Sequence, residues 1–396
     1  MDPIGNPFTP GAGAPPPELA GRDELIERVR ITLERARIGR PGKSVLLVGL
    51  RGVGKTVLLD RMRETAEGAG MQTLRIEAPE HRSLPAMLAP QLRLALLGLS
   101  RVERAKDLAT RGLRGLAGFV KGLRIKYADI EVGLDAEPEA GLADNGDLEH
   151  DLQALFEVAG RAAREAGTVL ALFVDELQYV EANELAALIT ALHRTAQRNI
   201  PVVLVGAGLP MLHGRMGAAK SYAERLFDFP TVGPLSDAEA RRAIVAPLAV
   251  EGVAISEDAL ARIVTETQGY PYFLQEWGKH AWDVAAASPI TATDVDRASI
   301  TAVAALDESF FRVRFDRLTP AEKRYLRAMA ELGPGPHRSG EIARELGKEV
   351  TAVSLTRSNL IAKGMVWSPD HGDTAFTVPL FDAFMRRTMS DEDWRT

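Results

Sequence analysis

GLRGVGKT, at residues 49–56, matches the pattern GxxxxGK[ST] in full. The apolar residues 43–48 (KSVLLV) before it predict a buried parallel strand, and residues 56–67 after it have helical spacing. Glycines in such a turn let consecutive backbone N–H groups wrap a phosphate chain, and the following helix directs its positive end at the same charge. We therefore predict a phosphate-binding loop. Its residues are Gly49, Leu50, Arg51, Gly52, Val53, Gly54, Lys55 and Thr56.

The chemistry of this loop depends on a second apolar run, residues 169–174 (VLALFV), which ends in Asp175 and Glu176. In a phosphate-binding loop, Lys55 would reach the β- and γ-phosphates and Thr56 would bind Mg²⁺. A buried strand that delivers two carboxylates at its end predicts that Asp175 holds Mg²⁺ and that Glu176 activates the attacking water. The expected ligands are ATP or ADP and Mg²⁺.

The composition limits the remaining possibilities. The chain has 396 residues, 46% of them hydrophobic and 26% charged, which is typical of a soluble protein of two or three domains. A net charge of −6 argues against coating nucleic acid by bulk charge. The absence of cysteine excludes disulfides and thiolate chemistry. No run approaches the ~20 apolar residues of a membrane helix, so we expect a cytoplasmic protein with no membrane partner.

The order of patterns along the chain predicts several domains. Residues 1–17 are rich in Gly and Pro and predict a flexible arm, and residues 18–235 predict an α/β domain with a parallel sheet, because apolar strands alternate with helices. Residues 101–141 look like a basic insertion, with a helix and a possible hairpin at 123–134. Residues 236–301 are helical only, and a linking helix follows at 302–317. Residues 318–390 predict three helices and a hairpin, the outline of a winged helix-turn-helix.

Together these features resemble AAA+ ATPases of the origin-recognition (Orc-like) type, and equally the MNS and STAND groups of signalling NTPases. The resemblance implies an ASCE/AAA+-type P-loop NTPase fold with an α-helical lid at residues 236–301. It also implies an ATPase, converting ATP and water to ADP and phosphate, with the nucleotide between the sheet domain and the lid.

Two short motifs extend the resemblance to the nucleotide. Residues 19–24 (LAGRDE) are similar to an hhGRxxE element and imply that Arg22 lies near the base, although the acid falls one position early. Residues 269–271 (GYP) are similar to the GxP element of the lid, which implies that Pro271 packs on the adenine.

Other positions depart from these families or add to them. Residues 206–208 (GAG) stand where a polar sensor side chain is usual, and Tyr272 replaces a sensor arginine. These departures predict slow hydrolysis. Arg225 falls where such families place an arginine finger, which would complete the site of a neighbouring subunit in a homo-oligomer.

The output of this ATPase is open between two hypotheses. In the first, residues 350–363 form a recognition helix from which Arg357 and Lys363 face outward to double-stranded DNA, as in an Orc-like switch. In the second, a STAND-like signalling ATPase, the winged helix packs against the ATPase core or a protein partner and binds no DNA. Acidic and basic residues roughly balance in residues 318–390 and the sensor side chains are missing, which favours the second hypothesis. The basic residues of 101–141 and the outward Arg357 and Lys363 favour the first hypothesis, which we prefer.

Overall fold

The computed structural model describes residues 1–11, 13–40, 42–78, 82–123 and 136–395. The chain divides into two compact units. The sheet unit comprises Arg22–Gly49 and Lys55–Thr231, and the helical unit comprises Met1–Gly21, Leu50–Gly54 and Val232–Thr396. Apart from Leu123, the hairpin predicted at residues 123–134 lies outside the described residues.

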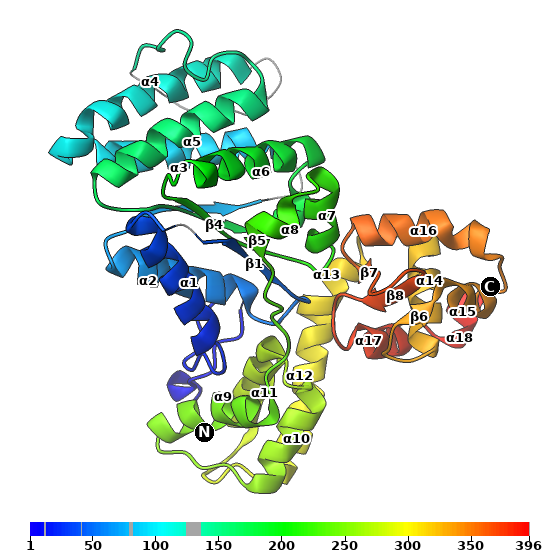
Figure 1. Ribbon diagram of the computed structural model, residues 1–396. Helices are drawn as coiled ribbons and strands as arrows, with labels where there is room; N and C mark the ends of the chain where they lie inside the picture. The colour runs from blue at the N-terminus through cyan, green and yellow to red at the C-terminus, as the bar shows by residue number, and fades with distance from the viewer. Residues whose placement is uncertain (12, 41, 79–81, 124–135, 396) are drawn as a thin grey trace. The chain divides into compact units, whose positions relative to one another are not determined.

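The sheet unit is built on a parallel sheet (Figure 1). Its strands are β1 (Ser44–Val48), β2 (Gln72–Glu77), β3 (Leu170–Asp175), β4 (Val202–Gly208) and β5 (Phe227–Asp228), and their order is β2-β3-β4-β1-β5. Every neighbouring pair is parallel, which confirms the predicted α/β fold class. Because β4 lies between β1 and β3, the carboxyl ends of these three strands meet at one edge of the sheet.

Helices cover both faces of this sheet (Figure 1). Helices α1 (Asp23–Arg37) and α2 (Lys55–Gly68) cover one face. Helices α3 (Leu84–Leu99), α5 (Leu148–Glu165) and α6 (Ala182–Gln197) cover the other, and α4 (Lys106–Leu123) packs on α3 and α5. The 3₁₀ turns η2 (Glu103–Ala105) and η3 (Leu177–Tyr179) precede α4 and α6, and the short helices α7 (Leu212–Ala219) and α8 (Ala223–Leu226) lead into β5.

Helix α4 corresponds to the predicted basic insertion, and it is an integral layer of the sheet unit. Leu116 and Phe119 on one side of α4 are fully buried in the core that the sheet shares with α3 and α5. Arg111, Arg114 and Lys121 are exposed on the other side. The basic residues therefore form only the outer face of an amphipathic helix.

The helical unit begins its main run at Ser236, whose side chain forms a capping box with that of Glu239. Four helices follow: α9 (Asp237–Val250), α10 (Glu257–Thr267), α11 (Pro271–Val284) and α12 (Ala292–Leu306). The π-helical turn η4 (Asp307–Phe311) and helix α13 (Arg312–Phe315) continue the chain.

The C-terminal segment of the helical unit combines helices with a small antiparallel sheet of order β6-β8-β7. Its elements are α14 (Pro320–Glu331), β6 (His337–Arg338), α15 (Ser339–Glu345), α16 (Val350–Ala362), β7 (Val366–Trp367), β8 (Asp373–Phe376), α17 (Phe381–Thr388) and α18 (Asp391–Arg395). These elements share one apolar core with α9–α12.

The first residues of the chain also belong to this core. The sequence predicts a flexible arm at residues 1–17, whereas Phe8 is 3% exposed and the short 3₁₀ turn η1 (Pro3–Gly5) precedes it. A Cβ atom on Gly278 of α11 would come within 2.6 Å of the Phe8 ring, so this glycine provides the space that the ring fills. The indole N–H of Trp282 donates to the carbonyl of Asp2 at 2.8 Å.

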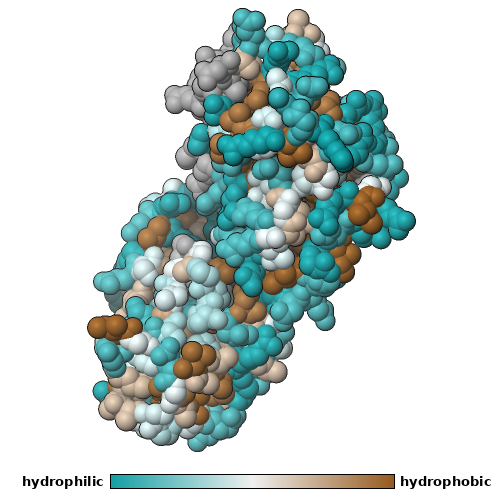
Figure 2. Space-filling view, turned by 90° about the vertical axis from the view of Figure 1, so that its left-hand side faces the viewer, coloured by the Kyte–Doolittle hydropathy of each residue, from teal (hydrophilic) through white to brown (hydrophobic). Residues whose placement is uncertain are grey.

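In the described part of the chain, no helix has the length and apolar character that crossing a bilayer requires. On the face of the molecule in Figure 2, hydrophobic residues form separate small groups among hydrophilic ones, as is usual for a protein surface.

Candidate nucleotide-binding and hydrolysis site

The predicted phosphate-binding loop connects β1 to α2. Gly52 and Gly54 have φ angles of 78° and 85°, in the left-handed region that glycine adopts without a steric penalty. Lys55 is the first residue of α2 and is 8% exposed, and its Nζ donates to the carbonyl of Gly49 at 3.0 Å. The N–H of Gly49 donates to the carbonyl of Gly208 at 3.2 Å, which ties the start of the loop to β4. A buried ammonium group at the start of a helix is well placed to meet a phosphate.

Asp175 and Thr56 lie together, as a shared Mg²⁺ site requires. Asp175 is the last residue of β3 and is 2% exposed. Burial raises the pKa of Asp175, a hydrogen bond from the Thr56 side chain opposes this change, and the nearby Glu176 carboxyl adds to it. Carboxylate and hydroxyl oxygens are the protein ligands that Mg²⁺ prefers. The residues present therefore fit the predicted ion.

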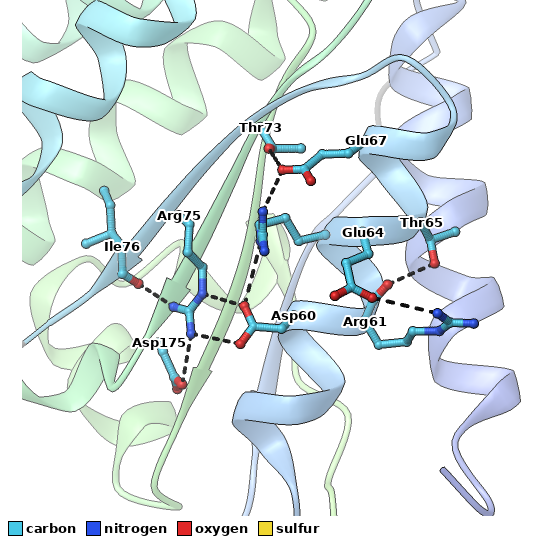
Figure 3. A network of polar contacts seen from close by, with 10 residues as sticks. Asp60, Arg61, Glu64, Thr65, Glu67, Thr73, Arg75, Ile76 and Asp175 are labelled. Carbon is cyan, nitrogen blue, oxygen red and sulfur yellow. Dashed lines mark hydrogen bonds and ion pairs between the residues drawn. The ribbon is translucent and has the colours of Figure 1, made fainter. Parts of the chain in front are cut away.

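An arginine that the sequence did not single out connects Asp175 to α2 (Figure 3). Arg75 on β2 donates through Nε to Asp60 Oδ1 at 2.7 Å, and its Nη2 lies 3.6 Å from Asp175 Oδ2. In the strand register Glu77 pairs with Asp175, so Arg75 is the diagonal neighbour of Asp175, within reach of a long side chain. Alternation in residues 72–77 (QTLRIE) is typical of a strand, but it does not indicate which strand lies beside β2.

Glu176 follows Asp175 in a strained conformation. Its φ of 54° and ψ of 35° are left-handed, which costs a residue other than glycine roughly 1–2 kcal/mol. The N–H of Glu176 donates to Asp175 Oδ1 at 2.8 Å, and its carboxylate accepts a hydrogen bond from Gln178 Nε2. Strain of this kind collects at functional sites.

The end of β4 explains why a sensor side chain is absent at residues 206–208. A Cβ atom on Gly206 would lie 2.3 Å from Leu177 Cδ1 and 2.7 Å from Leu46 Cδ2. A Cβ atom on Gly208 would lie 2.8 Å from Gln178 Oε1. Both positions require glycine because the turn after β3 fills the space beside them.

The tip of the phosphate-binding loop, Leu50–Gly54, groups with the helical unit. Within this unit the N–H of Tyr272 donates to the carbonyl of Gly52 at 3.1 Å. The Cβ of Pro271, the first residue of α11, lies 4.0 Å from the position that a Cβ on Gly54 would take. Burial, with Glu276 nearby, raises the pKa of Tyr272 to about 12, so this side chain stays neutral where the resemblance places a sensor arginine.

The two remaining arginines of the predicted ATPase site differ in exposure. Arg22 is 8% exposed and precedes the first turn of α1. Arg225 is exposed in α8, directly before β5 at the edge of the sheet. An exposed position at an edge is what an arginine that reaches a neighbouring subunit needs.

The predicted DNA-contacting side chains make contacts inside the C-terminal segment. The sequence predicts that Arg357 faces outward, whereas its guanidinium donates to Thr374 Oγ1 at 2.8 Å and to the carbonyl of Asp373 at 2.7 Å. Lys363 Nζ donates to Glu322 Oε2 at 2.7 Å. The outward orientation of Arg357 is therefore corrected: this side chain packs against β8.

The sheet and the loop define a P-loop NTPase, and comparison with known families agrees. Residues 18–205 match the model of the AAA ATPase domain, so this part of the chain is an AAA+-type ATPase domain. Residues 308–385 match a domain of unknown function (DUF8462). No protein of curated function matches the sequence.

Solved structures of other proteins resemble this chain to different degrees. The Walker-type ATPase PABY2304 of Pyrococcus abyssi has a TM-score of 0.59 at 16% identity, over 93% of this chain and 96% of that chain. This similarity establishes the fold. Weaker similarities link the chain to the Orc1 protein of Aeropyrum pernix in complex with DNA (TM-score 0.49, 16% identity, 94% of each chain) and to a mutant of the RuvB protein of Thermotoga maritima (TM-score 0.45, 16% identity, 90% and 92%).

Proposed function

We propose that this protein is an ATP-driven molecular switch that hydrolyses ATP slowly and transmits its nucleotide state through the C-terminal segment. The observation that carries the proposal is the hydrogen bond between Thr56 and Asp175, because it joins the end of the phosphate-binding loop to the end of β3. Lys55 and Glu176 adjoin these two residues in sequence and supply the phosphate contact and the base.

In the proposed mechanism, the loop N–H groups and Lys55 bind the phosphates, and Thr56 and Asp175 would hold Mg²⁺. The ion would neutralise charge on the β- and γ-phosphates. Glu176 accepts a proton from the attacking water as the water oxygen bonds to the γ-phosphorus. The bond between that phosphorus and the β–γ bridging oxygen then breaks, which leaves ADP and phosphate.

Two features support slow turnover. Tyr272 brings no positive charge to the position where the resemblance places an arginine. The proposed arginine finger, Arg225, would act only on the site of a neighbouring subunit. Hydrolysis would therefore depend on self-association.

For the output, the contacts of α16 favour a protein partner over DNA. Arg357 and Lys363 are held by the C-terminal segment itself, and the exposed side of α16 carries uncharged residues such as Ser354 and Leu355. DNA binding is the second candidate. It is supported by the exposed cationic face of α4 and by the order of helices and strands after residue 318, which we infer to be a winged helix-turn-helix.

The ATP-binding part of the proposal is tested by Lys55→Ala. Loss of the ammonium that reaches the phosphates should abolish binding of a non-hydrolysable ATP analogue with Mg²⁺, measured by calorimetry. Lys43→Ala is the matched control, because Lys43 is an exposed lysine that precedes β1 and donates to the carbonyl of Glu224. Wild-type affinity in Lys55→Ala would rule out the P-loop assignment.

Fluorescence anisotropy on labelled duplex, over a salt series with and without ATP, separates the two outputs. Because Arg357 bonds to β8, we expect Arg357→Ala to lower the stability of the fold. We expect no separate effect of this substitution on duplex binding. If DNA is the partner through α4, Arg114→Ala should flatten the slope of log K against log salt by about one unit for the lost phosphate contact. Absence of salt-dependent binding to any duplex would leave the protein partner as the output.

A further inference from the structure

Gln178 is a buried amide beside the carboxylate that we assign to water activation. It lies in η3 and is 3% exposed. Its Nε2 donates to Glu176 Oε2, and its Oε1 accepts from the N–H of Leu209 at 3.0 Å. An amide buried at this depth is costly when it loses a partner, so both contacts hold the side chain in place.

The chemistry of the two partners determines which way the amide points. The N–H of Leu209 can only donate and therefore requires the amide oxygen. An ionised Glu176 can only accept and therefore requires the amide nitrogen. Only one orientation of Gln178 satisfies both groups.

This amide connects two neighbouring strands of the sheet at their carboxyl ends. Glu176 comes directly after β3, and Leu209 comes directly after β4. Gly208 makes room for the connection, because a Cβ atom there would lie 2.8 Å from Gln178 Oε1. A glutamate side chain has three rotatable bonds, and a base that is not held loses much of its effect in catalysis.

We propose that Gln178 is a positioning residue for ATP hydrolysis. Its amide holds Oε2 of Glu176 at the end of β4, so that Oε1 of the same carboxylate meets the attacking water. The water proton passes to Glu176, and Gln178 exchanges no proton. This inference rests on the proposed function, because it assigns Glu176 as the base.

The test compares Gln178→Glu with Gln178→Leu. Glutamate is nearly isosteric and keeps an acceptor for the N–H of Leu209, but it replaces the donor to Glu176 with a repelling carboxylate. Leucine removes both hydrogen bonds. We expect kcat for ATP to fall on the order of 10- to 100-fold in both variants, as displacement of a catalytic group by about 1 Å does. The affinity for ATP should remain that of the wild type, because Glu176 and Leu209, the two partners of this amide, lie outside the phosphate-binding loop.

The control is Gln153→Leu, which removes a half-buried glutamine of α5 whose Nε2 donates to the carbonyl of Glu149 at 3.0 Å. It should leave kcat unchanged. A wild-type kcat in Gln178→Glu would show that the amide serves only Leu209 and would overturn the inference, as would a parallel loss of ATP affinity. If Gln178→Leu does not fold, Gln178→Glu decides alone. A wild-type protein that releases no phosphate would overturn the proposed function together with this inference.

Discussion

Asp175 combines two properties that oppose each other: burial raises its pKa, and binding of Mg²⁺ needs its ionised form. The hydrogen bonds from Thr56 and from the N–H of Glu176 oppose the effect of burial most, and Arg75 adds a smaller contribution from within the sheet. Its positive charge lowers the pKa of Asp175, although less than burial raises it. Because Asp60 of α2 holds the guanidinium at 2.7 Å, the helix that follows the phosphate-binding loop also sets the position of this charge.

We therefore predict that Arg75→Gln weakens Mg²⁺ binding. Removal of the cation favours the protonated form of Asp175, so the Mg²⁺ concentration needed for half-maximal ATP turnover should rise, by about 10-fold as for other residues that support a metal ligand. The effect should shrink as the pH rises, because the carboxyl group then ionises without help. A Mg²⁺ titration of phosphate release at two pH values measures both.

Arg63→Gln is the control for this substitution. Arg63 also lies on α2, with its Nε 3.7 Å from Asp60 Oδ1 and its Nη1 2.7 Å from Glu67. It should leave the Mg²⁺ dependence unchanged. Equal Mg²⁺ titrations for wild type and Arg75→Gln would show that Arg75 supports the packing of α2 on β2 and not the ion.

Among single residues, the sequence predicts a role only for those that belong to a motif with a fixed spacing along the chain. Lys55, Thr56 and Asp175 belong to motifs whose order along the chain gives their roles. Gln178 and Arg75 act through strands that are neighbours only in the folded sheet, so no local pattern predicts them. The inward orientation of Arg357 follows from helical spacing. Arg357 lies four residues after Val353 and three before Leu360, both of which are buried, so all three share one side of α16.

Among the elements, the segment between α12 and α14 differs most from a simple linker. The sequence predicts a linking helix at residues 302–317, and the structure has the end of α12, the π-helical turn η4 and α13. The ring of Phe311 in η4 lies 6.3 Å from Phe273 of α11 and 5.2 Å from Phe384 of α17. The predicted lid and the C-terminal segment are therefore parts of one apolar core, which lets a displacement of one move the other.

Helix α11 allows a test of this core through pH. Glu276 is 6% exposed; burial raises its pKa, and the Tyr272 hydroxyl and Lys279 oppose the change less strongly. The folded protein therefore binds the proton of Glu276 more tightly than the unfolded chain does. The ionised form costs stability, and this cost appears as the pH rises above the ordinary pKa of glutamate.

Glu276→Gln should thus unfold at a higher temperature than the wild type at pH 8, and the difference should vanish below the pKa of the unfolded carboxyl group. Each kcal/mol relieved corresponds to roughly 2–4 °C in Tm for a domain of 150–250 residues. Thermal unfolding at both pH values is the measurement. Glu257→Gln, at an exposed pair with Arg241, should show no such gain. If Glu276→Gln were less stable than the wild type at pH 8, the ionised Glu276 would stabilise the fold, contrary to this prediction.

At the scale of the whole molecule, the sequence predicts the order of elements better than their grouping. Strands β1 and β3 lie within one residue of the apolar runs at 43–48 and 169–174, and α2 lies within one residue of the helix predicted at 56–67, because periodicity is local. The strand order and the burial of α4 against α3 and α5 depend on contacts between distant segments. Composition alone likewise favours a free arm at residues 1–17 and does not reveal the space that Gly278 leaves for Phe8.

If Glu176 is the base for ATP hydrolysis, as we propose, its loss should stop phosphate release and leave ATP binding intact. Wild-type protein and Glu176→Gln are each mixed with ATP and Mg²⁺, and bound nucleotide and free phosphate are followed in the same samples. The amide can still orient water but cannot take its proton. We predict slow phosphate release by the wild type, and full ATP binding without release by the variant. Release by Glu176→Gln at the wild-type rate would contradict this prediction.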